Sequence, residues 1–234
     1  MSALDVDGVI FDLDATLVNL GGFVDWRGAQ ERVVEAYLEC GCAEAVVRRC
    51  CGEGLFHMLN MMWDELYATL PRDEAEYIQA KAYAVLDTYE AQAACRCQLM
   101  SGCLEALQWL RGFDVKMGVV TSNSQEIAER ILEANELRGF FAAVVGRTPK
   151  LRMKPHPDQL LACFDMLGVD PYRGVVIGDS VKDVKAAKAV GAYAVAVPAY
   201  FTEREALVEA GVDEIIDCLE EITDVLSPLL SEAR

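Results

Sequence analysis

Short apolar runs, each ending at a polar residue, a glycine or a proline, recur along this 234-residue chain and limit what it can fold into. Valine and isoleucine are frequent in them, and segments with helical spacing of apolar residues lie between them. Such runs are typical of parallel strands buried on both faces. The alternation predicts an α/β fold with a doubly wound parallel sheet. The strands we expect are residues 9–11, 116–120, 142–145, 174–177, 193–197 and 214–216.

One long stretch interrupts this alternation. From about residue 28 to residue 98 no strand-like run is found, and helices are expected at 31–38, 55–66 and 74–91. This stretch is far too long for a simple crossover, so we expect it to pack as its own all-helical bundle. The predicted division is a core domain of 1–20 and 99–234 and an inserted helical domain of 21–98. Further helices are expected at 104–110, 125–132, 158–167, 181–190 and 219–230.

The charge balance narrows the range of partners. The chain has 21 lysines and arginines against 38 aspartates and glutamates, which gives a formal charge of −17. Nucleic acids and anionic membranes are therefore not expected as partners, because both require clustered cations. No apolar run approaches the length of a membrane span, and the first residues show no signal-peptide pattern. We expect a cytoplasmic protein whose nine cysteines are reduced, with pair spacings too short for a typical zinc site.

Polar side chains follow the expected strands at the points where the strands end. Because ligands bind at the carboxyl ends of the strands of an open parallel sheet, these side chains are expected to converge on one crevice. Crowded carboxylates repel one another unless a hard cation such as Mg²⁺ lies among them, and Mg²⁺ binds carboxylate and phosphate oxygens. A carboxylate beside Mg²⁺ can attack phosphorus, and a second can act as acid and base. The candidate residues are Asp12, Asp14, Thr121, Ser122, Asn123, Lys154, Asp179 and Asp183.

Each of these residues also has an ordinary interpretation. Thr121 could begin the helix that follows it, Lys154 could be a surface charge, and Asp179 could lie in a strand-to-helix cap. Their shared position at strand ends, or in the loop that follows one, favours a single site over coincidence. A second Asp-x-Asp pattern at Asp5 and Asp7 has no apolar strand before it and is expected to be a solvated lead-in.

The segments that carry these residues resemble the motifs of the haloacid dehalogenase superfamily of hydrolases. The matching segments are VIFDLDATLV, VVTSN, RMKPHPD and VVIGDSVKDV, and the resemblance covers nearly the whole chain. The layout looks most like the phosphoglycolate phosphatase-like branch. The resemblance implies the Rossmann-like core of that superfamily, with the inserted helices serving as a cap.

The resemblance also implies a role for each matching residue. Asp12 would be the nucleophile and a Mg²⁺ ligand. Asp14 would be the acid and base and would bind Mg²⁺ through its backbone carbonyl. Thr121 would bind the phosphoryl group with help from Ser122 and Asn123, and Lys154 would orient Asp12 and offset phosphate charge. Asp179 would complete the metal site, with Asp183 supporting it directly or through water.

A loop in the inserted helices resembles the cap loop that family members lower onto the core. Gly52 and Gly54 would allow a close approach, and Arg48, Arg49 and His57 would be candidate substrate contacts. An ordinary turn with exposed arginines explains the same residues equally well. Closure of a cap would exclude bulk water from the reaction.

The chain departs from the family pattern at one position, where Ala15 replaces the usual glycine. Alanine disfavours a positive φ angle, so a small local adjustment is expected there. Asp14 is retained, which the resemblance links to hydrolysis of a phosphate ester. The leading hypothesis is a Mg²⁺-dependent phosphatase for a small phosphorylated metabolite, with phosphoglycolate as the first candidate. A phosphomutase and a non-catalytic binding module remain alternatives, and monomer and homodimer are both open.

Overall fold

The sheet organises the larger body of the molecule. We describe a computed structural model, which covers residues 5–52, 54–199 and 202–230. Within those residues the sheet has six strands in the order β3-β2-β1-β4-β5-β6, and every neighbouring pair is parallel. The strands are β1 (Gly8–Phe11), β2 (Lys116–Ser124), β3 (Ala143–Arg147), β4 (Gly174–Gly178), β5 (Tyr193–Ala196) and β6 (Glu214–Ile215).

The strand order reverses beside β1. The chain moves outward from β1 through β2 to β3, then returns across the sheet to β4, which pairs with the other side of β1. Phe11 at the end of β1 lies opposite Ile177 of β4, and the amide of Asp12 donates to the Ile177 carbonyl over 2.8 Å. Asp12 and Asp179 therefore emerge side by side at this reversal, the position at which such sheets bind ligands.

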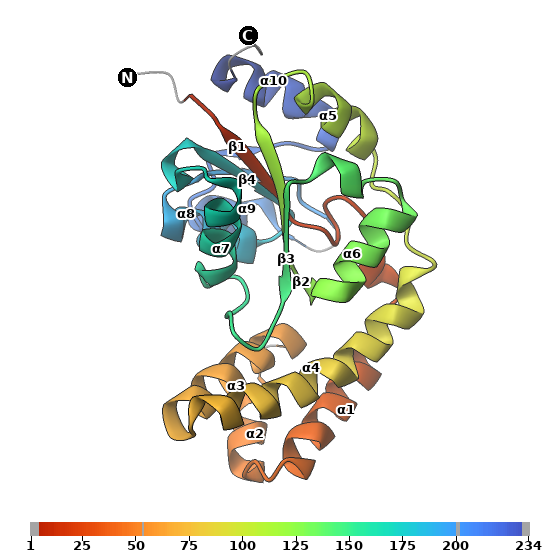
Figure 1. Ribbon diagram of the computed structural model, residues 1–234, viewed down its shortest axis with the longest axis vertical. Helices are drawn as coiled ribbons and strands as arrows, with labels where there is room; N and C mark the ends of the chain where they lie inside the picture. Colours follow the sequence, from red (N-terminus) through yellow and green to blue (C-terminus); the bar gives the residue numbers. More distant parts are fainter. Residues whose placement is uncertain (1–4, 53, 200–201, 231–234) are drawn as a thin grey trace.

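Helices cover both faces of the sheet (Figure 1). Successive side chains of a strand point to opposite faces, so Val9 and Phe11 join one buried cluster while Ile10 joins the other. The first cluster includes residues of α5 (Cys103–Leu110), α6 (Gln125–Ala134) and α10 (Ile222–Leu226). The second includes residues of α7 (Asp158–Leu167), α8 (Val181–Val190) and α9 (Arg204–Glu209). The predicted α/β class with a doubly wound parallel sheet is confirmed.

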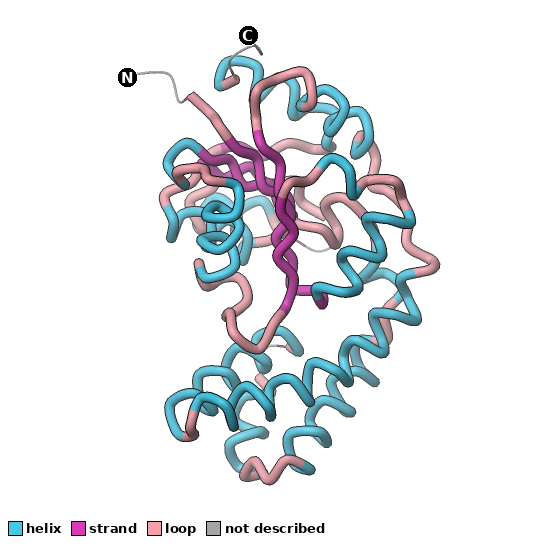
Figure 2. The backbone as a smooth tube through the Cα atoms, in the orientation of Figure 1, coloured by secondary structure: helices cyan, strands magenta, loops and turns pink. Residues whose placement is uncertain are grey.

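A separate helical body follows β1 (Figure 2). It consists of α1 (Trp26–Glu39), α2 (Glu44–Cys50), α3 (Leu55–Thr69) and α4 (Arg72–Ala94), which we call the cap. Its own buried cluster includes Tyr37, Met58 and Leu86. A core residue, Met153, completes that cluster, so the cap packs on the loop that precedes Lys154. The inserted all-helical part of the predicted fold class is confirmed.

The two segments that join the cap to the core lie side by side. Val18 and Leu99 form an antiparallel bridge between them. The amide of Asn19 donates to the Gln98 carbonyl over 3.0 Å, and the amide of Gln98 donates to Asn19 Oδ1 over 2.7 Å. The entry and the exit of the cap therefore form a short two-stranded ribbon, which we call the linker ribbon.

Several expected elements differ from those observed. The helix expected at 219–230 is instead the short α10 between two 3₁₀ turns, Leu219–Glu221 and Ser227–Leu229. Pro228 lies at the start of the second turn, where its missing N–H and its ring prevent a continued α-helix. The structure also contains α2 and α9, which we did not predict.

Asp5 and Asp7 precede the first strand with solvent-exposed side chains, as expected for a solvated lead-in. Both carboxylates also pair with the guanidinium of Arg173. The cause is the register of the sheet: Gly8 lies opposite Gly174, so the residues that precede these strands also meet. The hydrogen bond from Arg173 lowers the pKa of Asp7 below its ordinary value.

The nine cysteines are free thiols. Cys50, Cys103 and Cys163 are buried, where they pack as small apolar side chains. Among the helices of the described residues, none combines the length and apolar character needed to cross a membrane.

Candidate active site

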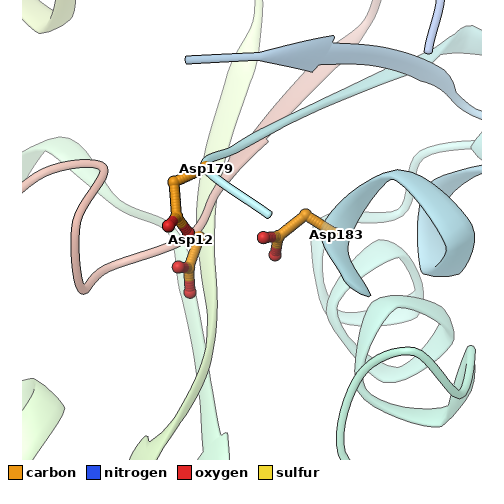
Figure 3. A group of neighbouring side chains, drawn as sticks. All are labelled: Asp12, Asp179 and Asp183. Carbon is orange, nitrogen blue, oxygen red and sulfur yellow. The ribbon is translucent and has the colours of Figure 1, made fainter. Parts of the chain in front are cut away.

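An acidic cluster lies at the reversal of the strand order. Asp12, Asp179 and Asp183 each offer a carboxylate oxygen, and these oxygens lie within 4.8 Å of one another. Figure 3 shows Asp12 and Asp179 at the ends of adjacent strands, with Asp183 facing them from the start of α8. Asp12 and Asp183 are buried and Asp179 is half-buried. The sheet therefore brings together charges that repel one another in the absence of a cation.

A glycine permits the close approach of Asp183. A Cβ atom on Gly178 would lie 2.3 Å from Cγ of Asp183, which is closer than real Cβ contacts allow. Asp183 also forms a capping box with Ser180, in which its Oδ2 accepts from the Ser180 amide over 3.1 Å. The capping box at the N-terminus of α8 thus fixes the direction of the Asp183 carboxylate.

Lys154 is the cation within this cluster. Its Nζ donates to Asp12 Oδ1 over 2.7 Å, to Asp183 Oδ1 and to the Val120 carbonyl over 3.1 Å. Burial alone lowers the pKa of Lys154, but the carboxylates of Asp12 and Asp183 outweigh it and raise the pKa above its ordinary value. For the carboxyl group of Asp12 the effect of burial has the opposite sign: burial raises its pKa, and the charge of Lys154 opposes the rise. Lys154 is therefore charged and holds Asp12 in a fixed orientation.

Asp14 bonds to the segment that leads into the cap and is not part of the acidic cluster. Its Oδ1 accepts from the amide of Gly21 over 2.7 Å, and a Cβ atom on Gly21 would lie 2.6 Å from the other oxygen. Burial raises the pKa of Asp14 to about 6, although backbone hydrogen bonds from Gly21 and Ala15 oppose the rise. A carboxyl group with such a pKa can both donate and accept a proton near neutral pH.

Thr121 lies in β2 where the pairing with β3 becomes irregular, and it lines the cavity. Its Oγ1 donates to Asn123 Oδ1 over 2.9 Å, and the amide of Asn123 donates back to Oγ1 over 3.1 Å. The side chain of Gln159 donates to the Thr121 carbonyl over 2.9 Å and so holds the backbone at this end of β2. The polar residues 121–124 at the end of β2 are therefore ordered by contacts among themselves and with α7.

A buried ion pair, which we did not predict, joins the polar end of β2 to the cap. Glu90 of α4 accepts from both terminal nitrogens of Arg147 over 2.9 and 3.0 Å, and neither side chain has measurable exposure. Glu90 also accepts from the Asn123 side chain over 3.1 Å and from the amide of Ser124 over 3.0 Å. Arg147 donates further to Asp87 over 2.6 Å. These contacts link cap helix α4 to the residue that orients Thr121.

The polar strand ends open into a cavity of about 470 Å³ between the core and the cap. All eight core residues predicted for the site line it. Residues that were not predicted also line it, and those from the cap side include two aromatic rings. The predicted residues are Asp12, Asp14, Thr121, Ser122, Asn123, Lys154, Asp179 and Asp183, and the others are Ala15, Gly21, Gly22, Trp26, Phe56, Ser180 and Lys182.

The structure does not bring the predicted cap residues into this cavity. The residues that line the cavity do not include Arg48, Arg49, Gly52, Gly54 or His57. Arg48 donates to Glu44 over 2.6 Å, one helical turn away, and Arg49 donates to Glu65 of α3 over 2.6 Å. In this structure nearby carboxylates therefore hold both exposed guanidinium groups outside the cavity, and a role for them in substrate binding stays a prediction.

The donors of the acidic cluster fit a divalent cation that prefers oxygen ligands. Asp12, Asp179 and Asp183 supply carboxylate oxygens at mutual distances that one ion can bridge, with Lys154 as the only cation bonded to them in the described chain. Hard cations such as Mg²⁺ bind such donors and keep positions for water or phosphate. Oxygen-only ligands make a softer metal such as zinc or copper a poorer fit.

Replacing Asp179 with asparagine is expected to stabilise the metal-free protein. Burial raises the pKa of Asp179, so in the metal-free protein its ionisation opposes folding as pH rises above the ordinary range for aspartate. The gain is absent near pH 4 and reaches about 2 kcal/mol, or roughly 4–8 °C in the unfolding midpoint, in mildly alkaline buffer. Thermal unfolding with a chelator across a pH series measures it. Asp165→Asn, at an exposed carboxylate on α7, is the control, and a lower midpoint for Asp179→Asn contradicts the prediction.

Replacing Ala15 with glycine is expected to stabilise the fold. Ala15 has a φ angle of +64°, the left-handed region that costs an alanine about 1–2 kcal/mol. Glycine removes that cost but loses more backbone entropy on folding, which leaves a gain of about 0.5–1 kcal/mol. Thermal unfolding measures the change. A lower midpoint would mean that the packing of the buried methyl group outweighs its backbone strain.

Comparison with known proteins agrees with this geometry. The profile described as haloacid dehalogenase-like hydrolase matches residues 9–197. The phosphoglycolate phosphatase of Rhodospirillum rubrum is 31% identical over 221 residues, covering 93% of this chain and 90% of that protein. The phosphoglycolate phosphatase of Escherichia coli K12 is 27% identical, covering 95% and 93% of the two chains.

Solved structures share the fold. CbbY from Rhodobacter sphaeroides, determined in complex with phosphate, matches with a TM-score of 0.65 at 20% identity, covering 93% of this chain and 96% of that one. A haloacid dehalogenase-like family protein from Streptococcus pneumoniae matches with a TM-score of 0.64 at 19% identity, covering 94% and 98%. Since the family profile spans most of the residues, including every polar strand end described above, the chain belongs to the haloacid dehalogenase-like hydrolases.

Proposed function

We propose that this protein is a Mg²⁺-dependent phosphatase that hydrolyses a small organic phosphate monoester through a phosphorylated Asp12. The observation that carries the proposal is the difference in environment between the carboxylates of Asp12 and Asp14, which lie two residues apart. Asp12 lies in the acidic cluster and is bonded to Lys154, whereas Asp14 accepts from Gly21 outside that cluster and has a pKa of about 6. One group suits attack on phosphorus, and the other suits proton transfer at the leaving group.

The chain's own residues account for both halves of the reaction. Asp12 attacks phosphorus, so an Asp12 O–P bond forms while the ester P–O bond breaks. Asp14 gives its proton to the departing alcohol oxygen, then takes a proton from the water that attacks the phosphorylated Asp12. That water releases inorganic phosphate and restores the Asp12 carboxylate. Thr121 binds a phosphoryl oxygen, and Lys154 offsets the charge and holds Asp12 in place.

The residues that would hold Mg²⁺ are Asp12, Asp179 and Asp183 through carboxylates and Asp14 through its backbone carbonyl. When bound, this ion supplies positive charge that screens the phosphate from the acidic cluster. We propose phosphoglycolate as the first substrate to test, because relatives that span most of the chain carry that name. A small phosphorylated metabolite in the cytoplasm is the proposed partner, and an acidic chain suits neither nucleic acid nor anionic membranes.

A screen of phosphate monoesters tests this proposal. Purified protein with Mg²⁺ is expected to release inorganic phosphate from several of them, and a chelator is expected to stop the release. The panel includes phosphoglycolate and a generic aryl phosphate. The absence of turnover across the panel would favour a binding module on the same fold. Isomerisation of a sugar phosphate without net release of phosphate would instead indicate a phosphomutase.

A further inference from the structure

The cap side of the cavity is formed by aromatic rings rather than by charges. Trp26 of α1 and Phe56 of α3 both line the cavity, with ring centroids 5.4 Å apart and planes at 62°. Both rings are half-buried, so part of each remains free to meet a ligand. We call this pair the aromatic wall. The two rings come from different helices, so the packing of the cap fixes their relative position.

The indole of Trp26 has a fixed orientation. Its Nε1 donates to the Gly21 carbonyl over 2.9 Å, which satisfies the only polar atom of the ring. The Nζ of Lys182 lies 5.5 Å from the centroid of the Phe56 ring, a distance at which a cation is attracted to an aromatic face. The aromatic wall is therefore held in place before any ligand arrives, which favours binding of a rigid apolar group.

The aromatic wall lies next to the residue that serves the leaving group. Gly21 accepts from Trp26 through its carbonyl and donates to Asp14 through its amide over 2.7 Å. One residue thus connects the wall to the proposed general acid. A group attached to the oxygen that Asp14 protonates extends toward the cap, where Trp26 and Phe56 form the lining.

The described cap residues that line the cavity offer no positively charged side chain to a polar leaving group. Among the described residues, the cap side chains that line the cavity include no arginine, lysine or histidine. Arg48 and Arg49 are bound to Glu44 and Glu65 outside it. Apart from Lys154, which is bonded to carboxylates, Lys182 of α8 is the cation of the lining. A short anionic leaving group would therefore find a single cation, Lys182, at this wall, and burying its charge against the two rings costs desolvation free energy.

We propose that the aromatic wall binds an aromatic ring of the leaving group, so that the preferred substrates are phosphate monoesters of aromatic or heteroaromatic alcohols. This inference rests on the proposed phosphatase function and adds a substrate class to it. An aromatic ring gains both apolar burial and favourable ring–ring geometry against Trp26 and Phe56. The cavity volume of about 470 Å³ lies in the range of pockets that hold such ligands.

Three esters of primary alcohols test this preference through kcat/KM. Benzyl phosphate is expected to exceed phosphoglycolate by about tenfold or more, and cyclohexylmethyl phosphate, which has a similar size without aromaticity, by about threefold. Phe56→Leu and Trp26→Leu are each expected to reduce the ratio of benzyl phosphate to phosphoglycolate by about tenfold. Tyr77→Leu, which removes an exposed aromatic ring of α4, is the control and is expected to leave this ratio unchanged.

The outcomes separate this inference from the proposed function. Higher kcat/KM for phosphoglycolate than for benzyl phosphate would overturn the aromatic preference while the phosphatase function stands. An equal loss on both substrates in Phe56→Leu would overturn it as well. If no ester is hydrolysed, the proposed function fails, and binding of benzylphosphonate by calorimetry decides the inference alone. Binding that weakens about tenfold in Phe56→Leu supports the aromatic wall, and absence of binding to the native protein overturns it.

Discussion

Asp12→Asn is expected to abolish phosphate release while leaving the fold intact. Asparagine keeps the shape of aspartate but lacks the anionic oxygen that attacks phosphorus, so kcat is expected to fall by at least about 10⁴-fold. Lys154 retains its hydrogen bonds to Asp183 and Val120, so the buried ammonium keeps a charged partner. Phosphate release under saturating Mg²⁺ and thermal unfolding of the same preparation measure the two effects.

Asp7→Asn provides the matched control for this substitution. Asp7 precedes the same strand, but its carboxylate pairs with Arg173 at the opposite end of the sheet. Turnover is expected to be unchanged. The pKa of Asp7 is lowered in the folded protein, so its stabilising effect is present at neutral pH and lost as pH falls through that lowered value. Turnover by Asp12→Asn at the native rate would contradict the proposed nucleophile.

Glu90→Gln is expected to produce the largest loss of stability among these variants. Glu90 is fully buried and accepts four hydrogen bonds, two of them from the buried guanidinium of Arg147. Removing its charge leaves Arg147 with Asp87 as its remaining carboxylate. Breaking a buried ion pair by removing one partner costs about 3–5 kcal/mol, and even 3 kcal/mol lowers the unfolding midpoint by roughly 6–12 °C.

The same substitution is expected to affect catalysis through Thr121. A glutamine side chain has one acceptor oxygen where Glu90 has two, so it cannot hold both the Asn123 side chain and the Ser124 amide. The Asn123 oxygen accepts from the Thr121 hydroxyl, so we expect a lower kcat, measured at a temperature where the variant is folded. Glu76→Gln, which removes a surface ion pair with Arg72 on the same helix, is the control and is expected to cost at most about 0.5 kcal/mol. Equal stability of Glu90→Gln and Glu76→Gln would show that the buried pair contributes little.

The sequence predicts the core of the site because strand ends follow a local pattern. Asp12, Thr121 and Asp179 each terminate an apolar run, and a parallel sheet brings such ends to one edge whatever the length of chain between them. The pairing of β1 with β4 agrees with this logic, since it brings Asp12 and Asp179 to one crevice, whereas the order of the other strands is known only from the structure. The family resemblance then adds the chemical roles.

The contacts of the cap cannot be predicted in this way. Glu90 and Arg147 are 57 residues apart, and neither has a local pattern that distinguishes it from a surface charge. Trp26 and Phe56 reach the cavity only because of how α1 and α3 pack. Arg48 is predicted to contact the substrate because its segment resembles a family cap loop, and only the structure shows that it donates to Glu44, one helical turn away. Side chains positioned by helix packing therefore require the structure.

The linker ribbon has a consequence for how this chain is assembled. Hydrogen bonds from Asn19 to Gln98 and from Met100 to Leu17 flank the Val18–Leu99 bridge, so the two ends of the inserted chain are held together where they leave the core. The spacing of these ends does not depend on how many residues lie beyond them, and lengthening a closed loop changes its entropy only slowly. Changes in the helices that carry Trp26 and Phe56 can therefore alter specificity without changing the strand order that holds Asp12, provided that the buried contact of Glu90 with Arg147 is kept.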